Sequence, residues 1–454
     1  MLDLIVIGGG PAGYHAAERA ARAGMQVCLF EKNTLGGVCL NEGCIPSKAL
    51  LYSAKILENA RACKRYGIEV AEARPDPGMI VKRSEKVIRT LVAGVRARMK
   101  NAGVEVVREA ALVCGKSGEG FKVAAGEGEY AARRLLICAG SQPAVPPIPG
   151  IREHLGGFVL TNREALSLKE IPGELVVIGG GVIGLEMAAY YNAMGSRVTV
   201  VEMLEHIGGP LDTEIADLLQ RELARQGIQF YLQAQVQSVR EGGVLYREKD
   251  ATVEIAADKV LLAVGRRPAA ENLGLETIGV AMERGAVKAD AQGRTNVEGV
   301  YAAGDCIGGV MLAHTAYREA EVAVQAMLGR EESVHYDANP SVIYTHPEVA
   351  CVGLSEEEAA RRGMDYEVRK LSMRYSGRFL AENEGGDGLC KILAEKGSRR
   401  ILGAHMLGNS SSEAIWGMAA LIGMGADVYQ ARATIFPHPT VGEILRETLW
   451  EFED

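Results

Sequence analysis

Two cysteines near the N-terminus, Cys39 and Cys44, have the spacing and surroundings of a redox-active pair. They lie within residues 35–50, LGGVCLNEGCIPSKAL. In a regular helix, the Cα atoms of two residues five positions apart are farther from each other than the roughly 4.4–6.8 Å that a disulfide tolerates. The pair can therefore be bridged only where the backbone is distorted, which Gly43 permits and Pro46 favours. A strained, accessible disulfide is the labile kind, so we expect thiol–disulfide exchange here.

The two cysteines could instead be buried structural residues or part of a zinc site. Two cysteines in a core helix would be buried and inert. A zinc site would need further Cys or His residues at ligand spacing, which the sequence does not supply, so we expect no metal. Lys48 would favour a thiolate nearby, whereas Glu42, between the cysteines, would raise the pKa of a neighbouring thiol.

A histidine and a glutamate near the C-terminus could supply acid–base chemistry. His438 lies between two prolines in FPHPTVGE, residues 436–443, and Glu443 follows five residues later. A lone histidine is more often a structural residue. A carboxylate that fixes the imidazole tautomer and raises its basicity instead favours a general acid–base role. Phe436 makes the immediate surroundings of this base more apolar.

The elements that must position these groups include a motif that occurs twice. An apolar run of buried-strand length leads into G-x-G-x-x-G, an alanine-rich helical segment and a second apolar run that ends in an acid. The first glycine and the acid are 23 residues apart in both copies (31 − 8 and 202 − 179). Two such βαβ units predict two doubly wound domains, each binding a dinucleotide. The residues are Gly8, Gly10, Gly13 and Glu31 in one copy and Gly179, Gly181, Gly184 and Glu202 in the other.

Each position in the glycine motif has its own task. The first glycine allows the tight turn, the second lets the backbone approach a pyrophosphate, and the third permits close packing of helix on strand. The helix N-terminus adds free N–H donors, and the acid suits the ribose hydroxyls. After Glu202 the segment Met203–His206 has no Arg or Lys for a 2′-phosphate, so NAD is favoured over NADP unless a basic residue reaches in from elsewhere.

Length and composition limit what else the chain could be. A chain of 454 residues suggests about three domains. A net charge of −8 argues against binding to nucleic acid or an anionic membrane. Nine cysteines are not a disulfide-scaffold density, and no signal or transit peptide precedes the first strand. The longest apolar stretch, Ala414 to Ala426, is short of the ~20 residues of a spanning helix. We therefore expect a soluble, cytoplasmic protein.

The regions between the motifs suggest where domains end. A Pro-rich link covers residues 141–150, and a second boundary falls near 264–268. A helical pattern covers 82–100, and the glycine-spaced stretch 113–130 predicts a small hairpin. From about Tyr336 onward strand and helix patterns mix without a third glycine motif, which predicts a differently folded domain.

Together these motifs resemble the flavoprotein disulfide reductases, which are class I pyridine nucleotide-disulfide oxidoreductases. CLNEGCIPSK, residues 39–48, is similar to their redox-disulfide motif, and its Pro-Ser-Lys ending is most similar to the members that oxidise dihydrolipoamide. TNVEGVYAAGD, residues 295–305, is similar to the second FAD contact of the family. Residues 344–353 and 436–443 are similar to its dimerisation domain. The resemblance thus extends over essentially the whole chain.

The resemblance implies an α/β fold with two doubly wound, Rossmann-like dinucleotide-binding domains and an α+β dimerisation domain. The implied divisions are an FAD-binding domain in two parts, 1–145 and 265–335, an NAD-binding domain, 146–264, and an interface domain, 336–454.

The resemblance also implies roles for individual residues. Asp305 would bind the ribityl chain of FAD, and His314 would lie near the flavin ring. Lys48 would pair with Glu186 near the flavin and nicotinamide. His438 would exchange protons with the substrate dithiol, and Glu443 would orient the His438 imidazole. The implied FAD-binding residues are Gly8, Gly10, Gly13, Glu31, Lys48, Gly140, Asp305 and His314, and the implied NAD-binding residues are Gly179, Gly181, Gly184, Glu186, Glu202 and Gly265.

The function implied is FAD-dependent oxidation of protein-bound dihydrolipoamide, with NAD⁺ reduced to NADH. The enzyme would be a homodimer whose partner subunits complete each other's sites. Its substrate would be a lipoylated E2 core or glycine-cleavage carrier supplied as a separate protein. Alternatives are an NADPH-linked glutathione-type reductase, disfavoured by Glu202 and Pro-Ser-Lys, and a mercuric reductase, disfavoured because residues 445–454 hold no cysteine pair. A redox-sensing flavoprotein or a binding module without turnover is a further alternative.

Overall fold

The computed structural model describes residues 1–249 and 251–453, whose contacts divide into two compact units. The first unit contains residues 1–49, 81–144 and 265–334. The second contains residues 50–80, 145–264 and 335–454. Each unit is therefore built from three separate stretches of chain. In the first unit, one sheet combines strands from all three of these stretches.

A mainly parallel sheet forms the centre of the first unit. β1 (Leu2–Ile7) lies between β2 (Val27–Phe30) and β6 (Gly128–Ile137), and both neighbours are parallel to it. β3 (Glu105–Val107) extends the sheet beside β2, and β19 (Val300–Ala302) pairs with β6. From Leu4 to Ile7 the strand β1 is almost fully buried, which explains this unbroken apolar run.

The predicted hairpin is confirmed and continues into a third strand. β4 (Ala111–Ser117) and β5 (Gly120–Ala125) pair antiparallel, and β5 pairs antiparallel with β6. The long strand β6 thus belongs to both the parallel and the antiparallel parts of the sheet.

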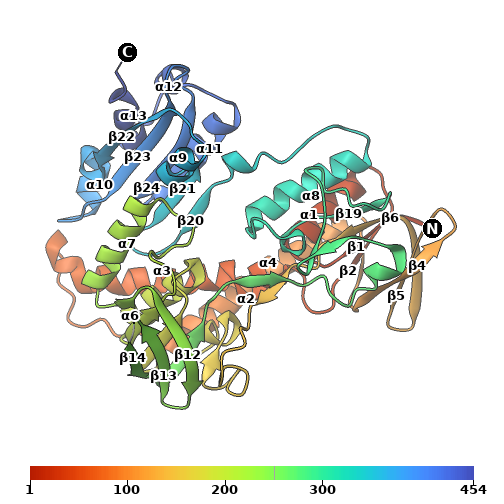
Figure 1. Cartoon of the computed structure of the whole chain (residues 1–454), viewed down its shortest axis with the longest axis horizontal. Coiled ribbons are helices and arrows are strands. Elements are labelled where there is room, and N and C mark those ends of the chain that lie inside the picture. The colour runs from red at the N-terminus through yellow and green to blue at the C-terminus, as the bar shows by residue number, and fades with distance from the viewer. Residues whose placement is uncertain (250, 454) are drawn as a thin grey trace. The chain divides into compact units, whose positions relative to one another are not determined.

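Helices α1 (Pro11–Arg22) and α8 (Ala313–Met327) pack against each other beside this sheet (Figure 1). Their alanines allow a close approach, and Leu4, Val6 and Leu136 of the sheet share their core. The predicted helix over 82–100 is confirmed within α4 (Pro77–Asn101). The short helix α2 (Gly37–Glu42) precedes α3 (Cys44–Ala62), which runs from the first unit into the second.

The second unit holds another parallel sheet, in the order β11-β10-β9-β15-β8. Its strands are β8 (Val159–Leu160), β9 (Glu174–Ile178), β10 (Arg197–Val201), β11 (Gln229–Tyr231) and β15 (Lys259–Leu262). Helices α6 (Val182–Met194) and α7 (Thr213–Arg225) connect β9, β10 and β11. An antiparallel sheet of β12 (Ala234–Arg240), β13 (Gly243–Glu248) and β14 (Ala251–Ala256) follows.

The C-terminal part of this unit is the differently folded region that the sequence predicts. Its antiparallel sheet has the order β20-β21-β24-β23-β22. The strands are β20 (Ser341–Ile343), β21 (Val349–Gly353), β22 (Tyr366–Ser372), β23 (Leu389–Glu395) and β24 (Ile401–Leu407). α11 (Ser411–Gly423) and α13 (Glu443–Trp450) pack on it, and α9 (Glu356–Arg361), α10 (Gly377–Glu382) and α12 (Val428–Arg432) are shorter (Figure 1). Within the described residues no helix is long and apolar enough to cross a membrane.

Candidate active site and nucleotide-binding loops

The first glycine loop joins β1 to α1. Gly8 has φ +109°, and a Cβ on it would lie 2.1 Å from the carbonyl oxygen of Cys138. A Cβ on Gly13 would lie 1.7 Å from the carbonyl oxygen of Gly8. Neither position can accept a side chain, so the loop and helix approach as closely as the motif requires. A Cβ on Gly10 would meet only the Cα of Gly37, at 3.8 Å, which leaves the helix N-terminus accessible.

The second glycine loop, between β9 and α6, repeats this geometry. A Cβ on Gly179 (φ +104°) would lie 2.5 Å from the carbonyl oxygen of Ala263. A Cβ on Gly184 would lie 2.1 Å from the carbonyl oxygen of Gly179. Around Gly181, no atom of the described chain outside its own neighbours comes within 4 Å of such a Cβ. The middle glycine of each loop is thus the one with space beside it.

The acids at the ends of β2 and β10 bind the glycine loops directly. The backbone N–H of Gly9 donates to Oε2 of Glu31 at 2.7 Å, and that of Gly180 donates to Oε2 of Glu202 at 2.6 Å. The other carboxylate oxygen of Glu202 accepts from the N–H of Leu204 at 2.8 Å. Both carboxylates are largely buried, so each is fixed beside the turn where a ribose would lie.

These observations fit a dinucleotide at each loop. Within the described chain no side chain caps α1 or α6, so the N–H groups of their first turns can bind phosphates. The cradle beside Gly10 and Gly181 is the space that a Cβ would occupy. The sequence resemblance predicts FAD at the first loop and NAD at the second, and this assignment stays a prediction.

A second group of residues in the first unit surrounds Asp305, which directly follows Gly304. The hydroxyl of Ser141 donates to Oδ2 of Asp305. Arg266 donates from Nε to the Ser141 hydroxyl at 2.7 Å and from a terminal nitrogen to the Ser141 carbonyl oxygen at 2.9 Å. The N–H of Gly304 donates to the buried carboxylate of Glu319 at 2.7 Å. The Asp305 carboxylate is thus held by Ser141, which Arg266 positions in turn, and its role toward a ribityl chain stays a prediction.

Three further predicted residues, Gly140, Gly265 and His314, lie in the first unit. Gly140 (φ +72°) and Gly265 (φ +107°) have open space where a Cβ would be, in keeping with a close approach by a ligand. His314 is exposed in the first turn of α8.

The cysteine pair lies where the backbone leaves helical conformation. α2 ends at Glu42, Gly43 has φ −147° and ψ −107°, and Cys44 begins α3. A hydrogen bond with Cys44, followed by burial, raises the pKa of the Cys39 thiol, while the positive charge of Lys48 lowers it. The distortion at Gly43 therefore brings together two thiols that an unbroken helix would hold apart.

His438 and Glu443 form a pair at the surface of the second unit. Nδ1 of His438 lies 2.9 Å from Oε1 of Glu443, and Oε2 of Glu443 accepts from the N–H of Thr440 at 2.9 Å. The Thr440 and His438 hydrogen bonds hold the pKa of Glu443 below its usual value. The His438 side chain is 80% exposed, and Ile435 beside it is 94% exposed. Such an accessible base and apolar side chain are what a subunit interface would cover.

The structure leaves one predicted pairing open. Lys48 belongs to the first unit and Glu186 to the second. Glu186 is buried in α6, and its Oε1 accepts from the backbone N–H of Tyr344 at 3.1 Å. The pairing of Lys48 with Glu186 therefore stays a prediction.

Sequence reasoning missed several residues around these sites. Ser141 and Arg266 lie in segments that the sequence marks only as domain boundaries. Tyr14, directly after Gly13, shares a hydrogen bond between hydroxyls with Tyr317 on α8, and both rings pack in the cluster that includes Cys39. Burial raises the pKa of both tyrosines. No local motif marks these contacts, since they join residues 125–303 positions apart.

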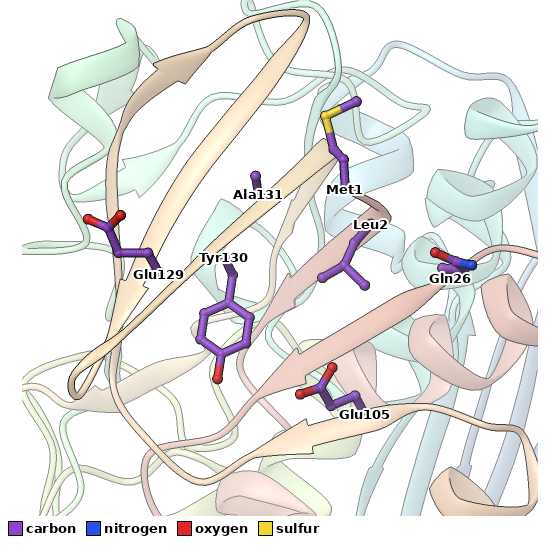
Figure 2. Close-up of a pocket in the computed structure, with 7 residues that line it drawn as sticks. All are labelled: Met1, Leu2, Gln26, Glu105, Glu129, Tyr130 and Ala131. Carbon is purple, nitrogen blue, oxygen red and sulfur yellow. The ribbon is translucent and has the colours of Figure 1, made fainter.

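One surface cavity of the first unit has none of the predicted site residues in its lining (Figure 2). It has a volume of about 280 Å³. Its lining includes Leu2, Gln26 and Glu105, at or just before the starts of β1, β2 and β3. Nucleotides bind beyond the carboxyl ends of parallel strands, so this cavity is at the wrong end of the sheet for a dinucleotide.

Comparison with known proteins identifies the class to which this fold and these sites belong. Residues 2–320 match the family model of the pyridine nucleotide-disulphide oxidoreductases, and residues 339–449 match the dimerisation domain of the same family. The chain belongs to this family, and the predicted resemblance and fold class are confirmed. The predicted cofactors, FAD and NAD, are those of the family, and the chain is an oxidoreductase of this class.

Within this family, the chain is similar to several named proteins over almost its whole length. The chain is 37% identical to a dihydrolipoyl dehydrogenase of Rhizobium etli, covering 98% of this chain and 97% of the relative. It is 39% identical to dihydrolipoyl dehydrogenase 3 of Pseudomonas aeruginosa, covering 98% and 96%. Among solved structures, LpdA from Mycobacterium tuberculosis matches with a TM-score of 0.91 and 26% identity, covering 99% of both chains. The flavoprotein disulfide reductase RclA from Escherichia coli matches with a TM-score of 0.86 and 29% identity, covering 99% of this chain and 100% of RclA.

Proposed function

We propose that this protein oxidises protein-bound dihydrolipoamide to lipoamide and reduces NAD⁺ to NADH through a disulfide between Cys39 and Cys44. The observation that carries the proposal is the break at Gly43, which lets two thiols interact in the unit that also holds the FAD loop. Full-length similarity to dihydrolipoyl dehydrogenases supports the choice of substrate.

The chain's own residues perform the thiol chemistry. His438 accepts a proton from one substrate thiol, and the resulting thiolate attacks Sγ of Cys39, so that the Cys39–Cys44 bond breaks and Cys44 leaves as a thiolate. The second substrate thiol, once deprotonated, attacks the mixed disulfide. Lipoamide is released, and Cys39 and Cys44 hold the two electrons. When bound, FAD and NAD supply the acceptor chemistry through which this electron pair leaves as a hydride on the nicotinamide.

The electrostatics of the pair are consistent with the need for a separate base. Because Cys44 and burial raise the pKa of Cys39, the reduced Cys39 holds its proton firmly at neutral pH. Lys48 opposes this shift and favours a thiolate at the pair. Glu443 keeps His438 in the tautomer that accepts a proton at Nε2.

The proposal also includes the oligomeric state of the protein and the boundaries of its domains. The exposure of His438 and Ile435 supports a homodimer in which His438 acts on the pair Cys39 and Cys44 of the partner subunit. Residues 1–145 and 265–335 would bind FAD, 146–264 would bind NAD, and 336–454 would form the interface. The substrate would be a lipoylated E2 or glycine-cleavage carrier in the cytoplasm.

Steady-state turnover of the purified, FAD-loaded protein tests this function. We expect sustained reduction of NAD⁺ by dihydrolipoamide, and faster turnover with a lipoylated carrier domain than with free dihydrolipoamide. A single turnover would instead indicate a redox sensor. Preference for NADPH and glutathione disulfide would indicate the glutathione-type alternative. Either result would overturn the proposal.

A further inference from the structure

A buried lysine connects the C-terminal sheet to the NAD-binding region. Lys391 on β23 is 1% exposed, and its Nζ lies 2.9 and 2.8 Å from the two carboxylate oxygens of Asp212, which is 0% exposed. It also contacts the carboxylates of Glu214, at 3.3 Å, and Glu356. A buried ammonium group is stable only when its charge is compensated in this way.

Lys391 is the middle of three basic residues aligned across the sheet. It is the register partner of Lys370 on β22 and of His405 on β24. Cys390 and Ile392, its neighbours along β23, point to the opposite face and belong to the core that contains α13. One face of the strand thus contacts the NAD-binding region, and the other supports the helix that begins with Glu443.

Two helix N-termini meet above this basic row and cap each other. Asp212, the N-cap of α7, accepts from the N–H of Ile215 at the start of α7 and from the N–H of Glu356 at the start of α9, each at 3.4 Å. In return, the N–H of Thr213 donates to the carboxylate of Glu357 at 3.1 Å. Facing helix N-termini repel each other, and these carboxylates and hydrogen bonds offset that repulsion.

Asp212 ends the segment 203–212, which follows Glu202 and lies against the NAD loop. The N–H of Gly208 donates to the carbonyl oxygen of Gly180 at 2.8 Å, and Ile207 is buried beside Gly180. At its start, the N–H of Leu204 fixes the Glu202 carboxylate. Met203 and Leu204 are exposed, so the segment has few side-chain contacts of its own near the ribose acid.

We infer that Lys391 is a positioning residue for NAD: through Asp212 it fixes the segment 203–212, and through that segment it holds Glu202 and the loop at Gly180 in their binding geometry. Lys391 itself does not touch the nucleotide. This inference rests on the proposed binding of NAD at the second glycine loop. It assigns to the interface domain an indirect part in nucleotide affinity within the same subunit.

The test compares Lys391→Met with Lys370→Met in the FAD-loaded protein. Lys370 lies in the same row and contacts Glu214 from a half-exposed position, whereas the contacts with Asp212 come from Lys391, so Lys370 is the matched control. Calorimetric titration with NAD⁺ should show about a tenfold weaker affinity for Lys391→Met and less than a twofold change for Lys370→Met. The KM for NADH should rise in parallel, while the KM for lipoamide and the bound FAD stay at wild-type values.

A double variant separates positioning from folding. Lys391→Met leaves Asp212 buried without its cation, so the single variant could lose stability as well as affinity. Asp212→Asn with Lys391→Met removes both charges and keeps a good helix cap, so thermal stability should recover while NAD⁺ affinity stays low. Wild-type affinity in the double variant, or less than a twofold loss in a folded Lys391→Met protein, would overturn the inference alone. Wild-type protein that binds no NAD⁺ would overturn it together with the proposed function.

Discussion

Nδ1 of His438 lies 2.9 Å from Oε1 of Glu443, whose other oxygen is held by the backbone N–H of Thr440. These two contacts lower the pKa of Glu443, so the carboxylate stays ionised at neutral pH. An ionised partner at Nδ1 leaves Nε2 as the proton acceptor. The exposed imidazole is therefore oriented by a group that is itself fixed to the backbone.

Replacing the base should separate the two halves of the reaction. We expect His438→Gln to slow dihydrolipoamide oxidation by about 10²–10⁴-fold, because glutamine cannot accept the thiol proton. Electron transfer from NADH to an artificial acceptor does not need this proton and should change by less than about twofold. Both rates are measured on the same FAD-loaded preparation, and an equal loss in the two assays would contradict the base assignment.

Glu443→Gln should have a smaller and pH-dependent effect. The amide can still accept from Thr440, but it has no charge with which to stabilise the imidazolium that forms when His438 takes up a proton. We expect a loss of about 10–100-fold in dithiol turnover and a shift of the pH profile toward acid. A pH profile that superimposes on that of wild type would show that Glu443 has only a structural role.

The cysteine pair should be needed for every dithiol turnover. Cys39→Ser and Cys44→Ser should each abolish lipoamide-dependent turnover, because neither serine can form the disulfide or the mixed disulfide. Cys63→Ser is the control, since Cys63 lies in the 3₁₀ turn that follows α3. Substantial lipoamide turnover in either active-site variant, or a complete loss in Cys63→Ser, would contradict this assignment.

Much of the nucleotide-binding architecture could be predicted because it is local. Strand, glycine loop, helix and acid follow one another within about 25 residues, so Gly8, Gly13 and Glu31 already specify their own geometry. The break at Gly43 could likewise be predicted from the spacing of Cys39 and Cys44.

Contacts between distant segments could not be predicted in this way. Ser141 and Arg266 are 125 residues apart, and Asp212 and Lys391 are 179 apart. Their pairing depends on how whole sheets and helices pack, for which no spacing rule exists. Residues 50–80 join the second unit for the same reason, since the C-terminal part of α3 packs in a core with α6.

Two glycines of the NAD loop should respond differently to a methyl group. In Gly184→Ala the new Cβ would lie 2.1 Å from the carbonyl oxygen of Gly179, so the loop must deform. In Gly181→Ala the methyl group would enter open space where the pyrophosphate is proposed to lie. We expect Gly184→Ala to lower the melting temperature measured by differential scanning fluorimetry. Gly181→Ala should keep the melting temperature within about 1 °C of wild type but weaken the NAD⁺ affinity measured by calorimetric titration at least tenfold. Equal stability losses would contradict the distinction.

His405 should make the C-terminal sheet sensitive to acid. It is buried beside Lys391 in the sheet register, and its Nε2 lies 2.9 Å from the carbonyl oxygen of Leu354. Burial lowers the pKa of His405 below its usual value near 6.5. As the pH falls through about 6.5, His405 takes up a proton in the unfolded chain but not in the folded protein. The contribution of His405 to the free energy of unfolding is therefore fully present above this pH and is lost below it. The slope from this one group is at most about 1.4 kcal/mol per pH unit.

Urea unfolding at pH 7.5, 6.5 and 5.5 measures this slope. His405→Asn should be less stable than wild type at pH 7.5, because it loses buried contacts, but its stability should fall less steeply between pH 6.5 and 5.5. His335→Asn, at an exposed histidine of the same unit, is the control and should keep the wild-type slope. If wild type and His405→Asn lost stability in parallel over this range, the acid sensitivity would have to come from other groups, the carboxylates around Lys391 first among them.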